Sequence, residues 1–163
     1  MAKNVIRYQI ADYLGIPATG ETTTFHLMGT GFNTLDESPT ATVDKKAYIS
    51  DKSATGTITG YENVFAFDSD LMSDEQAIMA LYDVGRNQKT GADAQFSYVR
   101  VELFKTGAEN AYPARKFTVA AEIASISGAG AETVKVSGNL HQVGNFVDGT
   151  FNPTTKTFTE VQG

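Results

Sequence analysis

The sequence contains no cysteine and no tryptophan, and only four of its 163 residues are proline. Without cysteine the chain forms neither disulfide bonds nor Cys-based zinc or iron–sulfur sites, and thiol catalysis is excluded as well. Apolar runs last only a few residues, far short of the roughly 20 that a membrane-spanning helix requires. We therefore expect one domain over residues 1–163, with no membrane partner.

Positive charge is also scarce. Thirteen Lys and Arg residues stand against 19 Asp and Glu, which gives a net charge of −6 and an isoelectric point near 4.8. An acidic protein repels a phosphate backbone, so a duplex-binding function is disfavoured. Near the N-terminus, Lys3 and Arg7 lie where the apolar region of a secretory signal would continue, so we expect the chain to stay inside the cell that makes it.

Strand-forming residues are abundant, and Gly-rich or polar turns separate them at short intervals. Val99, Val101 and Leu103 alternate with Arg100 and Glu102, which is typical of a half-buried antiparallel strand. An N-terminal segment (1–20) precedes the first clear strand, and the last strand lies within residues 153–163. About eight strands are predicted, over residues 22–28, 40–49, 57–67, 95–104, 115–126, 133–142, 144–152 and 155–161.

One segment has a helical period. Ser73 and Gln76 have the spacing of a capping box, apolar residues follow at helical spacing, and Gly85 provides a stop. The sequence therefore predicts a single helix over about 73–85. Together with the strands, this favours a mainly β fold: an antiparallel sandwich or partial barrel with one flanking helix.

Residues for catalysis or metal binding do not converge in this sequence. The two histidines, His26 and His141, have no metal-ligand spacing to each other or to a carboxylate pair. The glycine pairs near residues 29–31 and 128–130 do not open a helix in a βαβ unit, so they predict turns rather than a nucleotide loop. We expect no enzyme activity, no cofactor and no metal site.

Several segments together resemble the major tail proteins of long-tailed bacteriophages, the subunits that form the tail tube. The resemblance runs from about residue 24 to 159 and is carried by their combined order. The segments are Ala47-Tyr48-Ile49, Gly60-Tyr61-Glu62, Tyr82-Asp83-Val84-Gly85, residues 134–144 and residues 149–159.

This resemblance implies a virion structural protein. Six copies would close into a ring, and rings assembled in the host cytoplasm would stack into the hollow tube of the virion tail, through which the genome is ejected. The implied partners are further copies of the chain, the tape measure, tail terminator and tail tip proteins, and genomic DNA in non-specific passage.

The polar stretch 44–60 is longer than a tight hairpin requires, and similar tail proteins use such a stretch for contact between rings. We assign it to ring stacking, with a flexible surface loop as the alternative. The residues assigned to this contact are Asp44, Lys45, Lys46, Asp51 and Lys52.

A tube lumen must avoid a continuous basic stripe, because repeated phosphate contacts would stall the passing DNA. Arg100 and Glu102 share the predicted outward face of one strand, and Thr118 and Glu122 mark the corresponding face of the next long strand. These four residues are the candidates for the lumen. The alternative is that they are ordinary exposed or intersubunit residues.

Two other functions stay open at the level of sequence. A monomeric β-sandwich binding module should carry a platform of aromatic residues on its loops, whereas the aromatics here, such as Phe65 and Tyr98, lie within predicted strands. The inner tube of a contractile tail or of a tail-like particle would have almost the same chemistry as a non-contractile tube.

Overall fold

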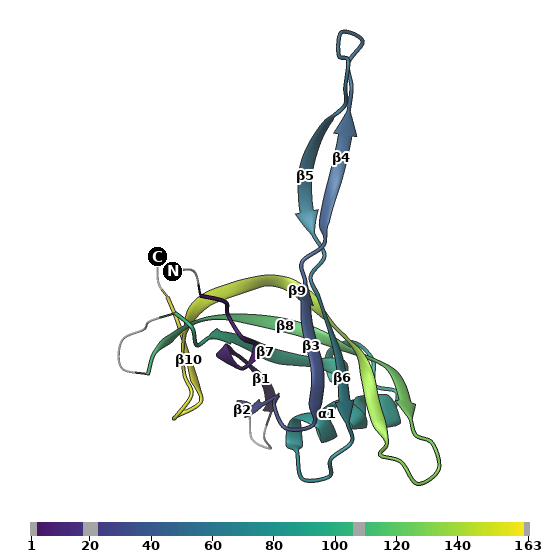
Figure 1. Ribbon diagram of the computed structural model, residues 1–163, viewed down its shortest axis with the longest axis vertical. Coiled ribbons are helices and arrows are strands. Elements are labelled where there is room, and N and C mark those ends of the chain that lie inside the picture. Colours follow the sequence, from purple (N-terminus) through teal and green to yellow (C-terminus); the bar gives the residue numbers. More distant parts are fainter. Residues whose placement is uncertain (1–2, 18–22, 106–109, 162–163) are drawn as a thin grey trace.

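The computed structural model describes residues 3–17, 23–105 and 110–161, and over these it is mainly β with a single α-helix, as predicted. Figure 1 shows the arrangement. The elements are η1 (Arg7–Gln9), β1 (Ile10–Pro17), β2 (Thr23–Leu27), β3 (Phe32–Ser38), β4 (Ala41–Lys46), β5 (Thr55–Tyr61), β6 (Val64–Asp70), α1 (Gln76–Arg86), η2 (Gly91–Ala94), β7 (Gln95–Glu102), β8 (Tyr112–Ser127), β9 (Lys135–Asn152) and β10 (Thr157–Glu160).

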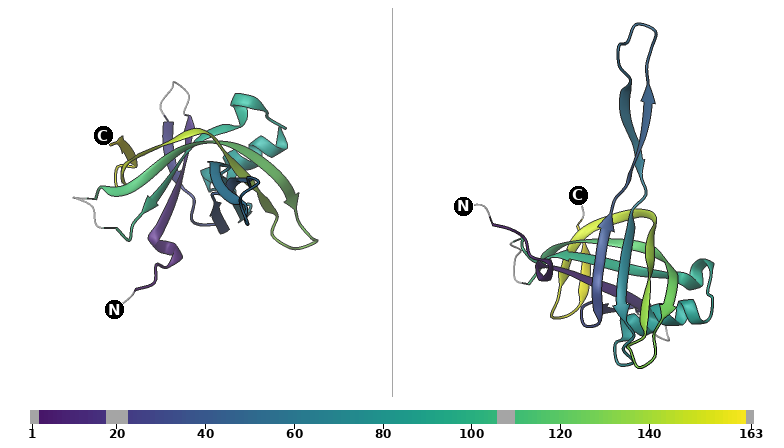
Figure 2. Two further views of the ribbon diagram at one scale, coloured as in Figure 1. Left: turned by 90° about the horizontal axis from the view of Figure 1, so that it is seen from above. Right: turned by 45° about the vertical axis from the view of Figure 1, so that its right-hand side comes forward.

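Eight strands form one curved antiparallel sheet: seven follow the order β2-β1-β7-β8-β9-β6-β3, and β10 pairs with β9 beside this path. The N-terminal half of the long strand β9 pairs with β6, and its C-terminal half pairs with β10. The sheet curls until β1 and β3 face each other, but no ladder joins them, so the barrel stays open (Figure 2). The remaining two strands, β4 and β5, form a separate hairpin.

Both faces of this sheet carry buried apolar residues. The main core lies on the concave face, where α1 packs against β8 and closes one end. Its buried members are Leu14, Met28, Leu35, Phe65, Phe67, Ala77, Leu81, Val84, Ala94, Tyr98, Phe117, Val119, Ala121, Val136 and Leu140. A second cluster on the opposite face comprises Tyr13, Phe25, Val99, Val101, Ala114 and Phe151.

Two bulges in the β8–β9 ladder allow the sheet to curl, since a bulge increases the local twist. One lies between Lys116 and Thr118, opposite Gly144, whose φ of 70° favours glycine. The other lies between Ile123 and Ser125, where a Cβ on Gly138 would lie 1.9 Å from the carbonyl oxygen of Glu122. Glycine at 138 and 144 therefore keeps residues 135–152 in one strand, where the sequence predicted two.

The structure also corrects three other sequence predictions. Residues 10–17, which the sequence left in the N-terminal segment, form β1 in the middle of the sheet path. The predicted strand 57–67 is broken at Glu62 and Asn63, where the chain passes from the hairpin into β6. The helix begins at Gln76 rather than at 73, and its N-cap, Glu75, makes no side-chain capping hydrogen bond, so the predicted capping box is absent.

Candidate assembly surfaces

The most exposed feature of the fold is the hairpin of β4 and β5, which projects from the body (Figure 1). Every residue of β4 is exposed, and so is every residue of β5 except Gly60. The predicted polar stretch 44–60 is therefore largely strand: Asp44, Lys45 and Lys46 lie on β4, whereas Asp51 and Lys52 lie at the tip. The predicted strands 40–49 and 57–67 cover β4 and most of β5, but the sequence did not predict that these strands form a hairpin separate from the main sheet.

The hairpin tip is held in a defined turn. The backbone N–H of Tyr48 donates to Asp51 Oδ2 at 2.8 Å, and the N–H of Asp51 donates to the Tyr48 carbonyl at 2.9 Å. Lys46 Nζ lies 5.0 Å from the centre of the Tyr48 ring. This turn presents Tyr48, 63% exposed, and the fully exposed Ile49 beyond the end of the strands. An apolar pair at the end of an arm is typical of a contact surface.

An isolated two-stranded hairpin is only marginally stable in water, because it buries little apolar surface. Along this hairpin Val43, Ile58 and Tyr61 are at least half exposed. Its strands pair with each other and have no buried member in either core cluster. The hairpin therefore contributes to neither core of the body.

The four residues predicted to line a lumen fall on two different surfaces. Arg100 and Glu102 lie on the concave side of β7 with Tyr98, and the Arg100 side chain is only 14% exposed. The alternation of apolar and charged residues predicted a buried face only on the side of Val99 and Val101, whereas residues on both faces of β7 are buried. Arg100 therefore does not lie on an outward face. Thr118 and Glu122 are exposed on the side of β8 opposite the main core.

Glu122 belongs to a small polar group on this outer face. Asn139, its register partner on β9, donates to Glu122 Oε1 at 2.8 Å, and His141 Nε2 lies 3.4 Å from the same oxygen. The hydrogen bond from Asn139, followed by that from His141, lowers the pKa of Glu122. The carboxylate thus stays ionised at neutral pH.

Register pairing extends this outer face across β8, β9, β6 and β3, and its side chains are mostly polar. Four of them are carboxylates and one is lysine. Its polar and charged members are Thr34, Asp36, Ser38, Asp68, Asp70, Thr118, Glu122, Lys135, Ser137, Asn139 and His141, and the apolar Val64, Ala66, Ala120 and Val143 lie among them. It is an acidic, solvated surface on the part of the outer side formed by β3, β6 and the adjoining halves of β8 and β9; the rest of that side carries the second apolar cluster.

A buried carboxylate that no pattern in the sequence singled out lies at the open seam of the barrel. Asp12 on β1 is 1% exposed. It accepts a hydrogen bond from Tyr98 Oη and pairs with Arg7 Nη2 at 2.6 Å, and Arg100 Nε lies 3.7 Å away. Burial, followed by the Asp12 charge, raises the pKa of Tyr98 well above its usual value, so the phenol stays protonated and donates.

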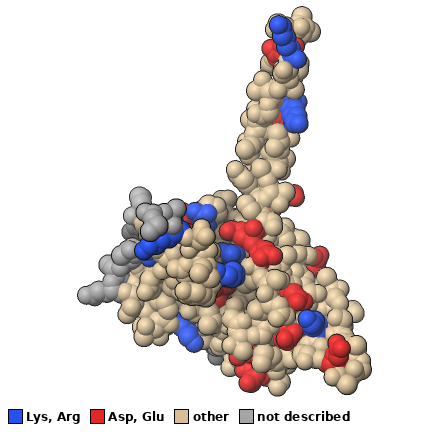
Figure 3. All heavy atoms as spheres, viewed as in Figure 1, with Lys and Arg blue, Asp and Glu red and all other residues tan. Residues whose placement is uncertain are grey.

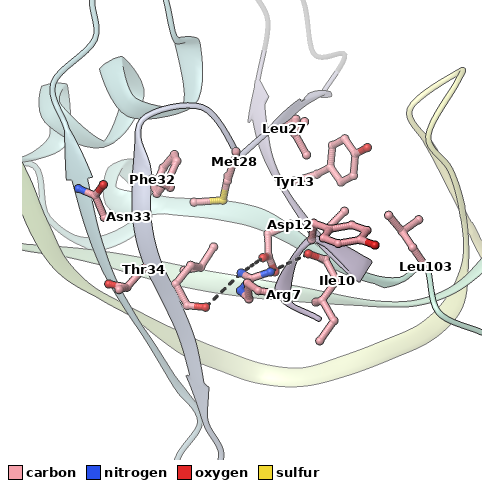
Figure 4. Close-up of a pocket in the computed structure, with 14 residues that line it drawn as sticks. Arg7, Ile10, Asp12, Tyr13, Leu27, Met28, Phe32, Asn33, Thr34 and Leu103 are labelled. Atoms are coloured by element: carbon pink, nitrogen blue, oxygen red, sulfur yellow. Dashed lines mark hydrogen bonds and ion pairs between the residues drawn. The ribbon is translucent and has the colours of Figure 1, made fainter. Parts of the chain in front are cut away.

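Arg7 also bridges the seam between β1 and β3 (Figure 4). Arg7 donates through Nη1 to the Ile10 carbonyl at 2.6 Å and through Nη2 to the Leu35 carbonyl at 3.2 Å. A groove of about 440 Å³ runs along this seam. Its lining is Arg7, Tyr8, Ile10, Ala11, Asp12, Tyr13, Leu27, Met28, Gly29, Phe32, Asn33, Thr34, Leu35 and Leu103.

Among the described residues, no group of three or more His, Cys, Asp or Glu side chains is arranged to hold a metal ion. Over the same ranges, no helix has the length and hydropathy needed to span a membrane.

A search of solved structures finds a similar fold in a chain from the SPP1 tail tube, determined by solid-state NMR and cryo-EM. The TM-score is 0.67 over 93% of this chain and 83% of that chain, at 13% sequence identity. A chain from the baseplate of the anti-feeding prophage matches with a TM-score of 0.49, at 5% identity over 91% of this chain and 97% of that one. No family model and no curated protein matches the sequence. The protein has the fold of a phage tail tube subunit.

Proposed function

We propose that the protein is a structural, non-enzymatic subunit of a phage tail tube. Six copies form a ring, and rings stack into the hollow conduit through which the genome leaves the particle. The observation that carries the proposal is the fold: the curved sheet, its helix and most of the chain's length match a tail tube chain at a TM-score of 0.67. The protein would assemble in the host cytoplasm and reside in the virion tail.

Ring closure is supported by the edges of the sheet. In the described residues, β2 and β3 each pair with only one strand, so each has a row of unpaired backbone groups at an end of the sheet path. Exposed edges favour pairing with another chain, and closure of a ring removes them. A contact between two different edges is heterologous. Repeated heterologous contacts close into a ring when the rotation from one copy to the next is a whole fraction of a full turn.

Ring stacking is assigned to the hairpin of β4 and β5, which includes the predicted stretch 44–60. Its exposed apolar residues and its lack of contact with either core are what a contact arm requires. At the two ends of the tube the same surfaces would contact the tail terminator and tail tip proteins.

The lumen is assigned to the acidic outer face of β3, β6, β8 and β9, which includes Thr118 and Glu122. A wall with net negative charge does not bind the phosphates of passing DNA, and the tape measure protein would occupy the same channel before ejection. Arg100 and Glu102 are left out of this assignment because they lie on the concave side of the subunit.

Assembly of the purified protein tests the proposed function. Light scattering coupled to size exclusion should show species of hexamer mass and larger at rising concentration, and negative-stain micrographs should show rings and hollow tubes. A protein that stays at its subunit mass of 17.5 kDa at high micromolar concentration, with no tubes in the micrographs, would refute the proposal.

Replacing Glu122 by Lys tests the lumen assignment. The change adds two units of positive charge per subunit, about a dozen per six-fold ring, and the repeat along the tube makes weak phosphate attraction cumulative. Particles with this tube should adsorb normally and eject DNA more slowly, and the defect should weaken as salt rises. Glu122→Gln, which adds half of that charge, should cause a smaller delay. Normal ejection by both variants at low salt would place Glu122 outside the channel.

A further inference from the structure

The hairpin and the rest of the chain carry charges of opposite sign. Residues 41–61 contain Lys45, Lys46 and Lys52 against Asp44 and Asp51, a net charge of +1. Because the whole chain carries −6, the remainder carries −7. A basic arm on an acidic body is complementary to the body of another copy, and charge complementarity fixes the register of an interface.

Acidic residues gather at the end of the body that lies farthest from the hairpin. Strand β6 leaves the hairpin at Val64 and runs to Asp70 at that end, where the loops 71–75 and 128–134 also lie (Figure 1). We call this end the acidic pole. It carries Asp74, Glu75 and Glu132 on these loops, and it borders the outer face at Asp70 and Lys135, whose Oδ1 and Nζ atoms are 3.9 Å apart.

The acidic pole and the hairpin lie at opposite ends of the long axis of the molecule. The space-filling view shows basic side chains, with an acidic one beside them, at the hairpin tip and mainly Asp and Glu at the lower end of the body (Figure 3). A second copy placed head to tail along this axis therefore brings a basic arm against an acidic surface. Such a contact is heterologous and repeats without limit in one direction, as a stacked filament requires.

The hairpin has the reach for this contact. From Ala41 to Lys46 the chain is extended, and at about 3.3 Å per residue this strand alone spans roughly 20 Å. Lys45 and Lys46 lie on its outer half, and Lys52 lies at the tip. The three positive charges are thus on the part of the arm that reaches another molecule, and not at its base.

We propose that the hairpin docks on the acidic pole of a second copy in the next ring, with Lys45, Lys46 and Lys52 facing its Asp and Glu residues. This inference rests on the proposed tube function and names the surface that receives the arm. It gives the stack a direction, because the arm of each copy meets the pole of the next.

A reciprocal charge swap tests the docking. The arm variant carries Lys45→Glu and Lys46→Glu, and the pole variant carries Asp74→Lys and Glu132→Lys; all four side chains are exposed. Each variant alone opposes like charges and should form rings but about 100-fold fewer tubes than the wild type. Mixed together, the two variants should form tubes again, since each variant's arm then meets a pole of opposite charge.

The control is Lys3→Glu with Lys156→Glu, which changes the net charge as much as the arm variant does but alters neither surface. This control should form tubes like the wild type. Wild-type tubes should also shorten as ionic strength rises from about 0.05 to about 0.5 M, because the Debye length falls. Circular dichroism establishes that each variant is folded.

The outcomes separate the docking from the proposed function. Tubes in the wild type, together with normal tubes in either single variant or no tubes in the mixture, would overturn the docking and leave the tube function standing. Absence of tubes in the wild type itself would refute the tube function and the docking together. Recovery of tubes only in the mixture supports both.

Discussion

Shortening the projecting hairpin is expected to abolish tube formation while the body keeps its fold. In the register of β4 and β5, Thr42 lies opposite Gly60. Replacing residues 43–59 by Asn-Gly therefore closes the chain with a two-residue turn that suits antiparallel strands. The variant removes the whole outer arm, including Tyr48 and Ile49 at its tip.

The deletion should abolish tubes but hardly change the stability of the body, because the arm is separate from the body. No residue of β4 or β5 is in either core cluster, so the free energy of unfolding of the body should change by less than about 1 kcal/mol. Thermal unfolding followed by circular dichroism measures this, and negative-stain microscopy measures tubes. Single rings should persist, because the edges of β2 and β3 are intact.

A milder variant serves as the control for the deletion. Thr57→Ser lies on β5 within the arm and should leave both stability and tube length unchanged. Tubes of normal length from the shortened protein would show that the arm does not hold rings together. A large loss of stability would show instead that the arm supports the body.

Sequence reasoning predicted the parts of this fold in which one face is buried and the chain follows a regular period. The helix was predicted because Ala77, Leu81 and Val84 recur at helical spacing, and all three are buried in the main core. On β8, Phe117, Val119 and Ala121 alternate with exposed residues, as predicted. In both elements, the buried positions coincide with the apolar residues of the periodic pattern.

The same reasoning failed where both faces of a strand are buried. On β1, Tyr13 packs in one cluster and Leu14 in the other, so the strand shows no alternation, and it was not predicted. On β7, Arg100 was predicted to point outward. It lies instead on the concave side, opposite the buried carboxylate of Asp12 on β1. A pairing between strands that are far apart in sequence leaves no local signal for either residue.

For the candidate assembly surfaces, the sequence predicted strands but not their place in the fold. The predicted strands 40–49 and 57–67 cover β4 and most of β5. That these two strands form a hairpin separate from the main sheet was not predicted, because local residue patterns do not specify which strands pair. The acidic outer face was likewise invisible until register pairing brought together residues from four strands.

Replacing Asp12 by Ala is expected to cause the largest loss of stability that a single polar side chain can produce in this protein. The change leaves Tyr98 Oη and the mostly buried Arg100 without their carboxylate partner. Breaking a buried ion pair costs about 3 to 5 kcal/mol, since the remaining charge stays desolvated. Half-exposed Arg7 can return to water, so we expect about 3 kcal/mol and a fall in melting temperature of roughly 10 °C.

Two further variants separate the buried position from the loss of a charge alone. Asp148 makes a 2.8 Å ion pair with Arg115 on the surface, and Asp148→Ala should cost less than about 1 kcal/mol, because exposed pairs are screened by water. Asp12→Asn keeps an oxygen that accepts from Tyr98 but removes the charge that Arg7 and Arg100 need, so its loss should lie between the other two. Urea unfolding measures all three. If Asp12→Ala costs no more than Asp148→Ala, the buried carboxylate does not hold the seam between β1 and β3, and the backbone contacts there suffice.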